Sequence, residues 1–287
     1  MTKRSIDPSS LSIPELHQYL LGSIGPRPIC FASTIDSNGV SNLAPFSFFN
    51  VFSANPPILV FSPAKSGRTG ATKNTHDNCK EIPEVVVNMV NYDMVQQMSL
   101  ASSPYPKGVD EFVKSGFTPI KSDLVTPFRV QESPVQLECK VIEIKELGEG
   151  GGAGNLIICE VVKMHIDENI IDEKNHINPN KIDLVSRMGG NYYCRASGDA
   201  LFEIPKPITS IGIGVDALPQ PIRQSAFLTG NDLGQLGQLE AIPDPEVYSN
   251  VRTMAPHQAF TEAKSLLKEN KTFEALCLLL KNTTDEQ

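Results

Sequence analysis

Residues 42–62 read NLAPFSFFNVFSANPPILVFS, and this stretch says most about the fold. Its first part, residues 42–50, combines small polar residues with three phenylalanines. Its last part, residues 57–62, is a short apolar run, and the Asn55-Pro56 pair before it is typical of a turn. The stretch therefore predicts a pair of strands joined by a tight connection.

Strand signals continue on both sides of this stretch. Upstream, residues 28–36 are rich in β-forming side chains and run into Asp36-Ser37-Asn38-Gly39, a hairpin turn signal. Downstream, further strands and two short helical pieces are expected: strands at 84–90, 135–146, 156–166 and 200–204, and helices at 93–102 and 109–115. Many short strands bounded by turn residues favour a mainly β fold, a barrel or a sandwich, over a doubly wound sheet.

The two ends of the chain differ from this β-rich middle. Ser12 and Glu15 predict a capping box that opens a short helix, and Gly22 ends it. Residues 206–250 are rich in Pro, Gly and Gln and are interpreted as an extended arm, whereas apolar residues at helical spacing predict helices over 256–280, broken near residue 271. The expected division is an N-terminal arm (1–21), a barrel (22–205) and an extended arm with C-terminal helices (206–287).

Charge and composition exclude several classes of protein. The chain has 25 basic and 33 acidic residues, a net charge of −8, which argues against a general nucleic-acid or anionic-membrane binder. No apolar run approaches the ~18–20 residues needed to span a bilayer. The chain start lacks the apolar core of a secretory signal, and the six cysteines show no Cys-x-x-Cys spacing. These features favour reduced thiols in a cytoplasmic protein.

Common catalytic and metal motifs are also missing. The run Gly148-Glu149-Gly150-Gly151-Gly152-Ala153 matches the dinucleotide fingerprint only superficially, because a strand pattern follows where a helix is needed. It is interpreted as a hairpin loop. The five histidines have no common ligand spacing, and no nucleophile elbow is present, so no metal ligand or catalytic residue is assigned.

The loop after the 57–62 strand carries the clearest chemical signal. Residues 63–74, PAKSGRTGATKN, hold three cations and several hydroxyl or amide donors, and they lead into a predicted helix. Backbone N–H groups at a helix start, together with an arginine, suit a phosphate. The neighbouring phenylalanines would suit a planar ring. On the residues alone, a solvated surface loop remains the alternative.

Five blocks of the sequence resemble the flavin-reductase-like, flavoredoxin-type family. They follow the family order over residues 22–205: Gly25–Thr34 with Gly39–Phe49, Asn55–Pro57 with Phe61-Ser62, Val85–Asn88, Glu160–Ile166, and Arg187–Tyr193. The resemblance implies a split β-barrel that binds FMN. The expected fold is this barrel with short peripheral helices and a C-terminal helical extension, which lies outside the resemblance. It also implies a homodimer with the flavin at or near the subunit interface.

The resemblance implies which residues contact FMN. The isoalloxazine ring would lie along one segment, the ribityl chain and phosphate along a second, and two further residues would approach the flavin from either chain of the dimer. The ring segment is Ala44, Pro45, Phe46 and Ser47, with Phe48 and Asn50 nearby. The ribityl and phosphate segment is Ser62, Arg68, Thr69, Lys73 and Asn74. The two further residues are His165 and Arg187. Arg187 or Lys65 would stabilise the negative charge of the reduced ring at its N1–C2 edge.

The sequence departs from the family pattern in two places. Many members carry a Lys-Asp-Thr triplet three to five residues before an asparagine, matched here to Asn74, so that the triplet positions are Thr69-Gly70-Ala71. Arg68 and Thr72 are then the available substitutes. The Gly-Gly-His element that some reductase members use near the nicotinamide is also missing.

The function that the resemblance implies is an FMN-dependent oxidoreductase. It would take a hydride from NAD(P)H and pass electrons to a second flavin, to oxygen or to a protein acceptor. Two alternatives stay open. One is an FMN-holding electron-transfer protein that is reduced by a carrier protein and has no nicotinamide site. The other is a partner that supplies reduced flavin to a monooxygenase.

Overall fold

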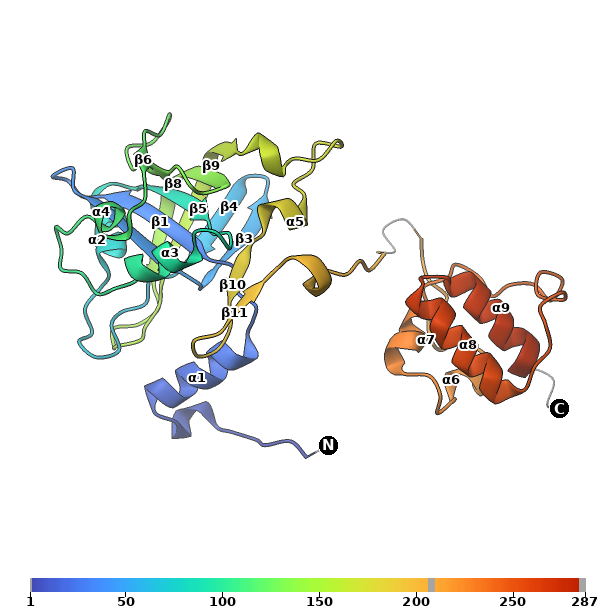
Figure 1. The fold of residues 1–287 in the computed structure, drawn as a ribbon. Helices are drawn as coiled ribbons and strands as arrows, with labels where there is room; N and C mark the ends of the chain where they lie inside the picture. The colour runs from blue at the N-terminus through green and yellow to red at the C-terminus, as the bar shows by residue number, and fades with distance from the viewer. Residues whose placement is uncertain (1, 206–209, 284–287) are drawn as a thin grey trace. The chain divides into compact units, whose positions relative to one another are not determined.

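The computed structural model describes residues 2–205 and 210–283, and the chain divides into two compact units, Met1–Phe202 and Glu203–Gln287 (Figure 1). All the strands of the described residues belong to the first unit. The second unit is helical and has a buried apolar cluster of its own.

The first unit is built from strands with short helices between them. Its strands are β1 (Cys30–Ile35), β2 (Ser41–Phe46), β3 (Phe49–Ala54), β4 (Pro57–Phe61), β5 (Glu84–Met89), β6 (Pro119–Ile120), β7 (Arg129–Val130), β8 (Val135–Glu146), β9 (Asn155–Ile166), β10 (Val185–Arg187) and β11 (Tyr193–Arg195). Its α-helices are α1 (Ile13–Ser23), α2 (Asn74–Glu81), α3 (Val95–Ala101), α4 (Glu111–Ser115) and α5 (Pro179–Ile182). Short 3₁₀ turns occupy Pro8–Ser10, Glu168–Ile170 and Gly198–Ala200.

Seven strands form one antiparallel sheet in the order β2-β1-β5-β8-β9-β4-β3. Strands β2 and β3 are the two edges of this sheet, yet only Ser47 and Phe48 separate them in the chain. The sheet must therefore curl until its edges meet at this corner. The result is a barrel that is not closed by hydrogen bonds between β2 and β3, which confirms the mainly β split-barrel prediction.

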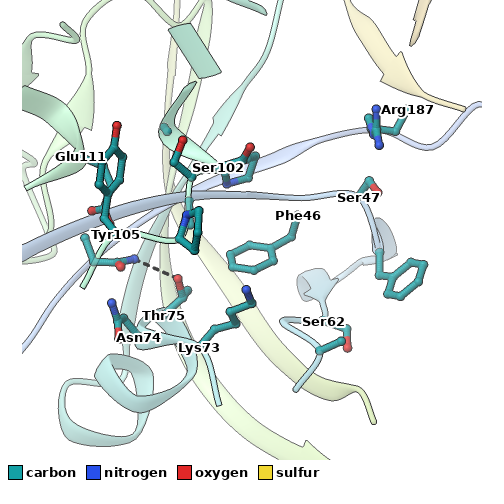
Figure 2. A pocket seen from close by; sticks show the side chains of 18 of the residues that line it. Phe46, Ser47, Ser62, Lys73, Asn74, Thr75, Ser102, Tyr105, Glu111 and Arg187 are labelled. Carbon is teal, nitrogen blue, oxygen red and sulfur yellow. Dashed lines mark hydrogen bonds between the residues drawn. The ribbon is translucent and has the colours of Figure 1, made fainter. Parts of the chain in front are cut away.

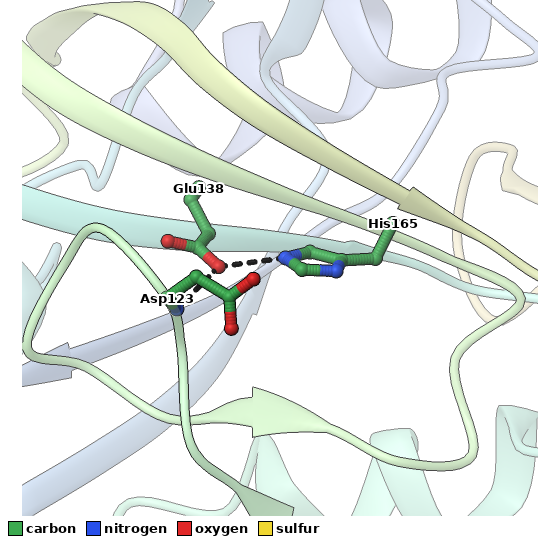
Figure 3. Close-up of side chains that lie close together, drawn as sticks. All are labelled: Asp123, Glu138 and His165. Carbon is green, nitrogen blue, oxygen red and sulfur yellow. Dashed lines mark hydrogen bonds and ion pairs between the residues drawn. The ribbon is translucent and has the colours of Figure 1, made fainter.

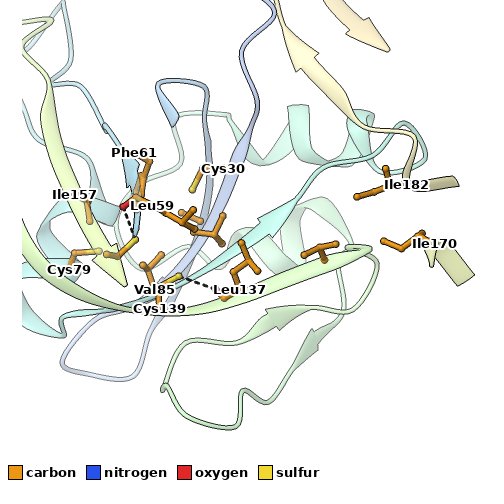
Figure 4. Close-up of a cluster of buried hydrophobic side chains, with 14 residues drawn as sticks. Cys30, Leu59, Phe61, Cys79, Val85, Leu137, Cys139, Ile157, Ile170 and Ile182 are labelled. Carbon is orange, nitrogen blue, oxygen red and sulfur yellow. Dashed lines mark hydrogen bonds between the residues drawn. The ribbon is translucent and has the colours of Figure 1, made fainter. Parts of the chain in front are cut away.

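The core of the barrel is an apolar cluster drawn from most of the strands (Figure 4). Along β1, Cys30 and Ala32 face this core, whereas Phe31 faces a second cluster that includes Met98 of α3 and Phe112 of α4. Side chains alternate between the faces of a strand, so β1 is buried on both sides. Helices α3 and α4 thus cover one outer face of the barrel.

All six cysteines are free thiols. Burial raises the pKa values of Cys30 and Cys79, whose thiols stay protonated and pack as small apolar groups.

The second unit contains α6 (Gln220–Arg223), α7 (Gly230–Leu236), α8 (Pro256–Lys268) and α9 (Thr272–Thr283). Leu236 of α7, Ala263 of α8 and Leu279 of α9 are fully buried in its core. The break between α8 and α9 agrees with the prediction. The prediction of an extended arm over 206–250 was wrong for the described residues of this segment, which include α6 and α7. The turn-forming residues there separate short helices that pack on α8 and α9 instead of keeping the chain extended.

The other predicted elements mostly match the structure. The Ser12–Glu15 capping box, the hairpin at Asp36–Gly39 and the strands at 135–146 and 156–166 are confirmed. The strand at 200–204 is wrong, because this segment follows a 3₁₀ turn and pairs with no other strand of the described residues. No helix in the described part of the chain is both long and apolar enough to cross a membrane.

Candidate functional site

A cavity of about 360 Å³ opens at the corner where β2 passes into β3 (Figure 2). Residues from five parts of the chain line it: His17 and Leu21; Asn42, Ala44, Pro45, Phe46, Ser47 and Phe48; Ser62, Ala64, Lys73, Asn74 and Thr75; Ala101, Ser102, Ser103, Pro104, Tyr105 and Glu111; and Arg187. The cavity therefore lies where the sheet curls upon itself.

The middle of the cavity is apolar and aromatic. The ring of Phe46 lies 5.7 Å from the ring of Phe61, which is fully buried in the barrel core. The ring of Phe48 meets His17 of α1 edge-on at 6.2 Å. Because Phe46 is held from behind by the core, it presents a rigid apolar wall that suits a flat ring.

One side of the cavity is polar and lies at the start of α2. Lys73 is the N-cap of this helix, and Asn74 and Thr75 form its first turn. Thr75 is buried, and its hydroxyl accepts a hydrogen bond from the Asn42 amide at 2.9 Å. The first N–H groups of a helix lack intrahelical partners, and with a lysine beside them they form a ready site for a phosphate.

The loop between β4 and α2 is held by the glycine-rich β8–β9 hairpin. The backbone N–H of Lys65 donates to the Ala153 carbonyl at 2.8 Å, and the Gly152 N–H donates back to the Lys65 carbonyl at 3.0 Å. The Asn155 N–H donates to the hydroxyl of Ser62, which lines the cavity. The Gly148–Ala153 motif is thus a hairpin loop, as predicted, and it supports the wall of the cavity.

The other end of the cavity carries Arg187, at the end of β10. Its backbone pairs with that of Arg27 through two hydrogen bonds of 2.8 and 2.9 Å. The Arg27 side chain is buried, donates to the carbonyls of Leu21, Ile24 and Met188, and reaches the Ser47 hydroxyl at 3.4 Å. This arginine joins the end of α1 to the β10–β11 hairpin.

Glu111 of α4 lines the cavity on the side of Asn42 and Thr75. Its carboxylate accepts a hydrogen bond from the Leu43 N–H at 3.0 Å and has no cationic partner among the described residues. Burial raises the pKa of Glu111. The bond to Leu43 fixes the start of the segment that forms the apolar wall.

Comparison with known proteins identifies this barrel. The sequence model of the flavin reductase like domain matches residues 22–182. The chain belongs to the flavin reductase like family. An uncharacterized protein from Aquifex aeolicus is 35% identical over 190 residues, which cover 66% of this chain and 94% of that protein. Family membership supports a flavin-related redox role.

Two solved structures are similar to this chain. Nitrilotriacetate monooxygenase component B from Bacillus cereus has a TM-score of 0.67 and 29% identity, and the match covers 71% of this chain and 100% of that one. A protein with a split barrel domain from Shewanella frigidimarina has a TM-score of 0.59 and 24% identity, with coverages of 69% and 96%, and shows the fold alone. The family match ends at residue 182, so the helical unit from Glu203 lies outside it.

The cavity collects most of the residues that the family resemblance implied. Those that line it are Ala44, Pro45, Phe46, Ser47, Phe48, Ser62, Lys73, Asn74 and Arg187. Four others do not line it. Asn50 is exposed on β3, Arg68 and Thr69 lie on the exposed part of the loop before α2, and His165 lies in another part of the barrel.

His165 belongs instead to a polar network around the buried carboxylate of Glu138 (Figure 3). Its Nε2 lies 2.7 Å from Oε1 of Glu138, a side chain with no exposed surface. The N–H groups of Asp123 and Leu124 donate to the same carboxylate at 2.8 and 2.6 Å. His165, Glu138 and Asp123 are close enough to resemble a metal site, but the Glu138 carboxylate is already used by these donors.

Lys73, Asn74 and Thr75 line the cavity as three consecutive residues. These three residues stand three to five positions before Asn78. Of the residues expected to hold the phosphate, Lys73 and Asn74 thus line the cavity, whereas Arg68 and Thr69 do not. Asn78 itself is buried and donates to Thr34.

Proposed function

We propose that this protein binds FMN in the cavity at the β2–β3 corner and acts as an NAD(P)H-dependent flavin oxidoreductase. The main support for the proposal is that one cavity is lined both by the aromatic ring of Phe46 and by Lys73 at the start of a helix. The two halves match a cofactor with a flat ring at one end and a phosphate at the other. Cofactor cavities typically have such apolar linings with a few placed polar groups.

The residues present fit the parts of FMN. Lys73 and the free N–H groups at the start of α2 would hold the phosphate, and Ser62 would bond the ribityl hydroxyls. The segment from Ala44 to Phe48 would lie against the ring. When bound, the flavin would supply the hydride-accepting chemistry, while the protein binds and orients it.

We also propose a homodimer in the cytoplasm. The edge strand β3 exposes Val51 and Phe52, with exposed fractions of 61% and 68%, and β9 exposes Met164. Exposed apolar side chains on an edge strand favour association with a second copy. The free thiols fit a reducing compartment.

The first test is the absorbance spectrum of the freshly purified protein, with mass analysis of what denaturation releases. A flavin spectrum with released FMN, together with NAD(P)H oxidation above background, is the expected result. A colourless protein that leaves the fluorescence of added FMN unquenched would overturn the proposal.

A second candidate function is supported by the likeness to nitrilotriacetate monooxygenase component B. A partner that supplies reduced flavin to a monooxygenase must release it, whereas an electron carrier must keep it. We expect stopped-flow measurement of FMN release before and after reduction to separate these roles. Release that is faster than turnover supports the supplier, and retention through many turnovers supports the carrier or the oxidoreductase.

The glycine-rich hairpin supplies a further prediction. A Cβ at Gly151 would lie 2.9 Å from the Ser66 carbonyl oxygen, whereas a Cβ at Gly150 would meet nothing within 4 Å. Gly151→Ala should therefore displace the loop before α2, lower stability by about 1–3 kcal/mol and weaken FMN binding. Gly150→Ala is the matched control. Thermal unfolding and FMN fluorescence titration measure both effects, and equal behaviour of the two variants would contradict the support role.

A further inference from the structure

A second cavity of about 210 Å³ adjoins the proposed flavin cavity. The two share Pro45, Phe46, Ser47, Ser102 and Arg187. The other residues that line this recess are Ile29, Met98 and Tyr193, and most of its accessible surface is polar. Its volume is below the ~300–1,000 Å³ of drug-sized ligand sites, so it suits only a small molecule or one part of a larger one.

Among the described residues, Arg187 is the only charged one that lines the recess. Its guanidinium lies 4.6 Å from the centre of the Tyr193 ring, and its Nη2 donates to the Gly190 carbonyl at 3.0 Å. These contacts hold the guanidinium in place but use few of its five donors. Figure 2 shows Arg187 and Ser47 close together at one end of the flavin cavity.

A second arginine, Arg27, lies next to Arg187. Arg27 is only 6% exposed, and its hydrogen bonds go to three carbonyls and to the Ser47 hydroxyl. Neither arginine has a carboxylate partner within the described residues. Burial, and then the positive charge of Arg187, lower the pKa of Arg27. Two neighbouring cations without a counter-ion are costly, and a bound anion would relieve that cost.

Ser47 connects the two arginines. Its oxygen accepts from Nε of Arg27 at 3.4 Å, so its own O–H is free to donate. A ligand beside Arg187 would thus meet the guanidinium fork and a hydroxyl donor, in a recess with a mostly polar surface. A guanidinium fork matches the two oxygens of a carboxylate.

We propose that the recess binds the carboxylate of a small organic acid, recognised by Arg187 and Ser47, as the second substrate of the flavin site. The inference rests on the proposed function, because it takes the neighbouring cavity to hold the flavin. It assigns the charge of Arg187 to this second ligand and the phosphate of the cofactor to Lys73, at the start of α2.

Calorimetric titration of the full chain with benzoate and with benzamide, its neutral isostere, tests the proposal. Each titration is run with and without FMN, and FMN is titrated separately. We expect benzoate to bind at least about tenfold more tightly than benzamide, since a charged hydrogen bond is lost in the amide. Arg187→Gln should weaken benzoate binding about tenfold or more and change FMN affinity less than about twofold. Arg187→Lys should restore part of the affinity.

Three results would overturn the proposal. They are no benzoate binding, equal binding of benzoate and benzamide, or a loss of FMN affinity in Arg187→Gln with benzoate binding unchanged. The last would assign Arg187 to the cofactor. Failure of the flavin proposal is seen separately, as no binding in the FMN titration. Arg68→Gln, on the exposed loop, is the control for a general change in surface charge, and thermal unfolding of Arg187→Gln checks that it folds.

Discussion

Lys73→Gln should weaken FMN binding about 10- to 100-fold, because a charge-assisted bond to a phosphate contributes about 1.5–3 kcal/mol. Lys73 is the N-cap of α2, lines the cavity and stands beside the N–H groups that start the helix. The side chain forms no ion pair with a carboxylate of the described residues, so its removal leaves no unpaired anion behind. The free energy of unfolding of Lys73→Gln should therefore differ little from that of the wild type.

Fluorescence titration of FMN against the two forms measures the loss. The matched control is Arg68→Gln, which removes one positive charge from the same loop at an exposed position outside the cavity. Both affinities are measured at two salt concentrations, since a general electrostatic effect is screened and a direct contact less so. Equal losses of FMN affinity in the two variants would show that only the charge of the loop matters. They would contradict the assignment of the phosphate contact to Lys73.

The strands of the barrel could be predicted because their signals are local. The segments 135–146 and 156–166 are long β-rich runs that flank a glycine-rich loop, and each forms one strand. The arm over 206–250 could not be predicted from its composition. There, Pro and Gly separate short helices, and only packing against α8 and α9 stabilises helices of four to seven residues.

Some residues of the candidate site could also be predicted from the sequence, and others could not. The segment from Ala44 to Phe48 is continuous in the chain, so its place in the cavity followed from one motif. His17, Tyr105 and Glu111 reach the cavity only through the packing of α1 and the α3–α4 region, and nothing beside them in the sequence indicates this. Arg68 was expected from its place in the 63–74 loop, but the loop turns its exposed part away from the cavity.

Glu138→Ala should lower the stability of the barrel unit by about 3–5 kcal/mol, with FMN affinity of the folded protein unchanged. The Glu138 carboxylate is fully buried and accepts from two backbone N–H groups and His165. Its removal leaves these part-buried donors without their acceptor, and an unpaired buried donor costs about 1–3 kcal/mol. Glu143→Ala, at an exposed position of the same strand, is the matched control.

The pH dependence of unfolding gives this prediction a second readout. Burial alone would raise the pKa of Glu138, but the N–H groups of Asp123 and Leu124 and the His165 ring outweigh it, so the pKa is lowered. A folded-state pKa below the unfolded value, about 4.3, means that the ionised carboxylate stabilises the fold above that pH. This stabilisation is lost as pH falls through the folded-state pKa. The stability difference between wild type and Glu138→Ala should therefore be full at about pH 7 and shrink in acid, as followed by chemical unfolding. A difference that stays constant down to acid pH would mean that Glu138 stabilises the barrel by packing rather than by charge.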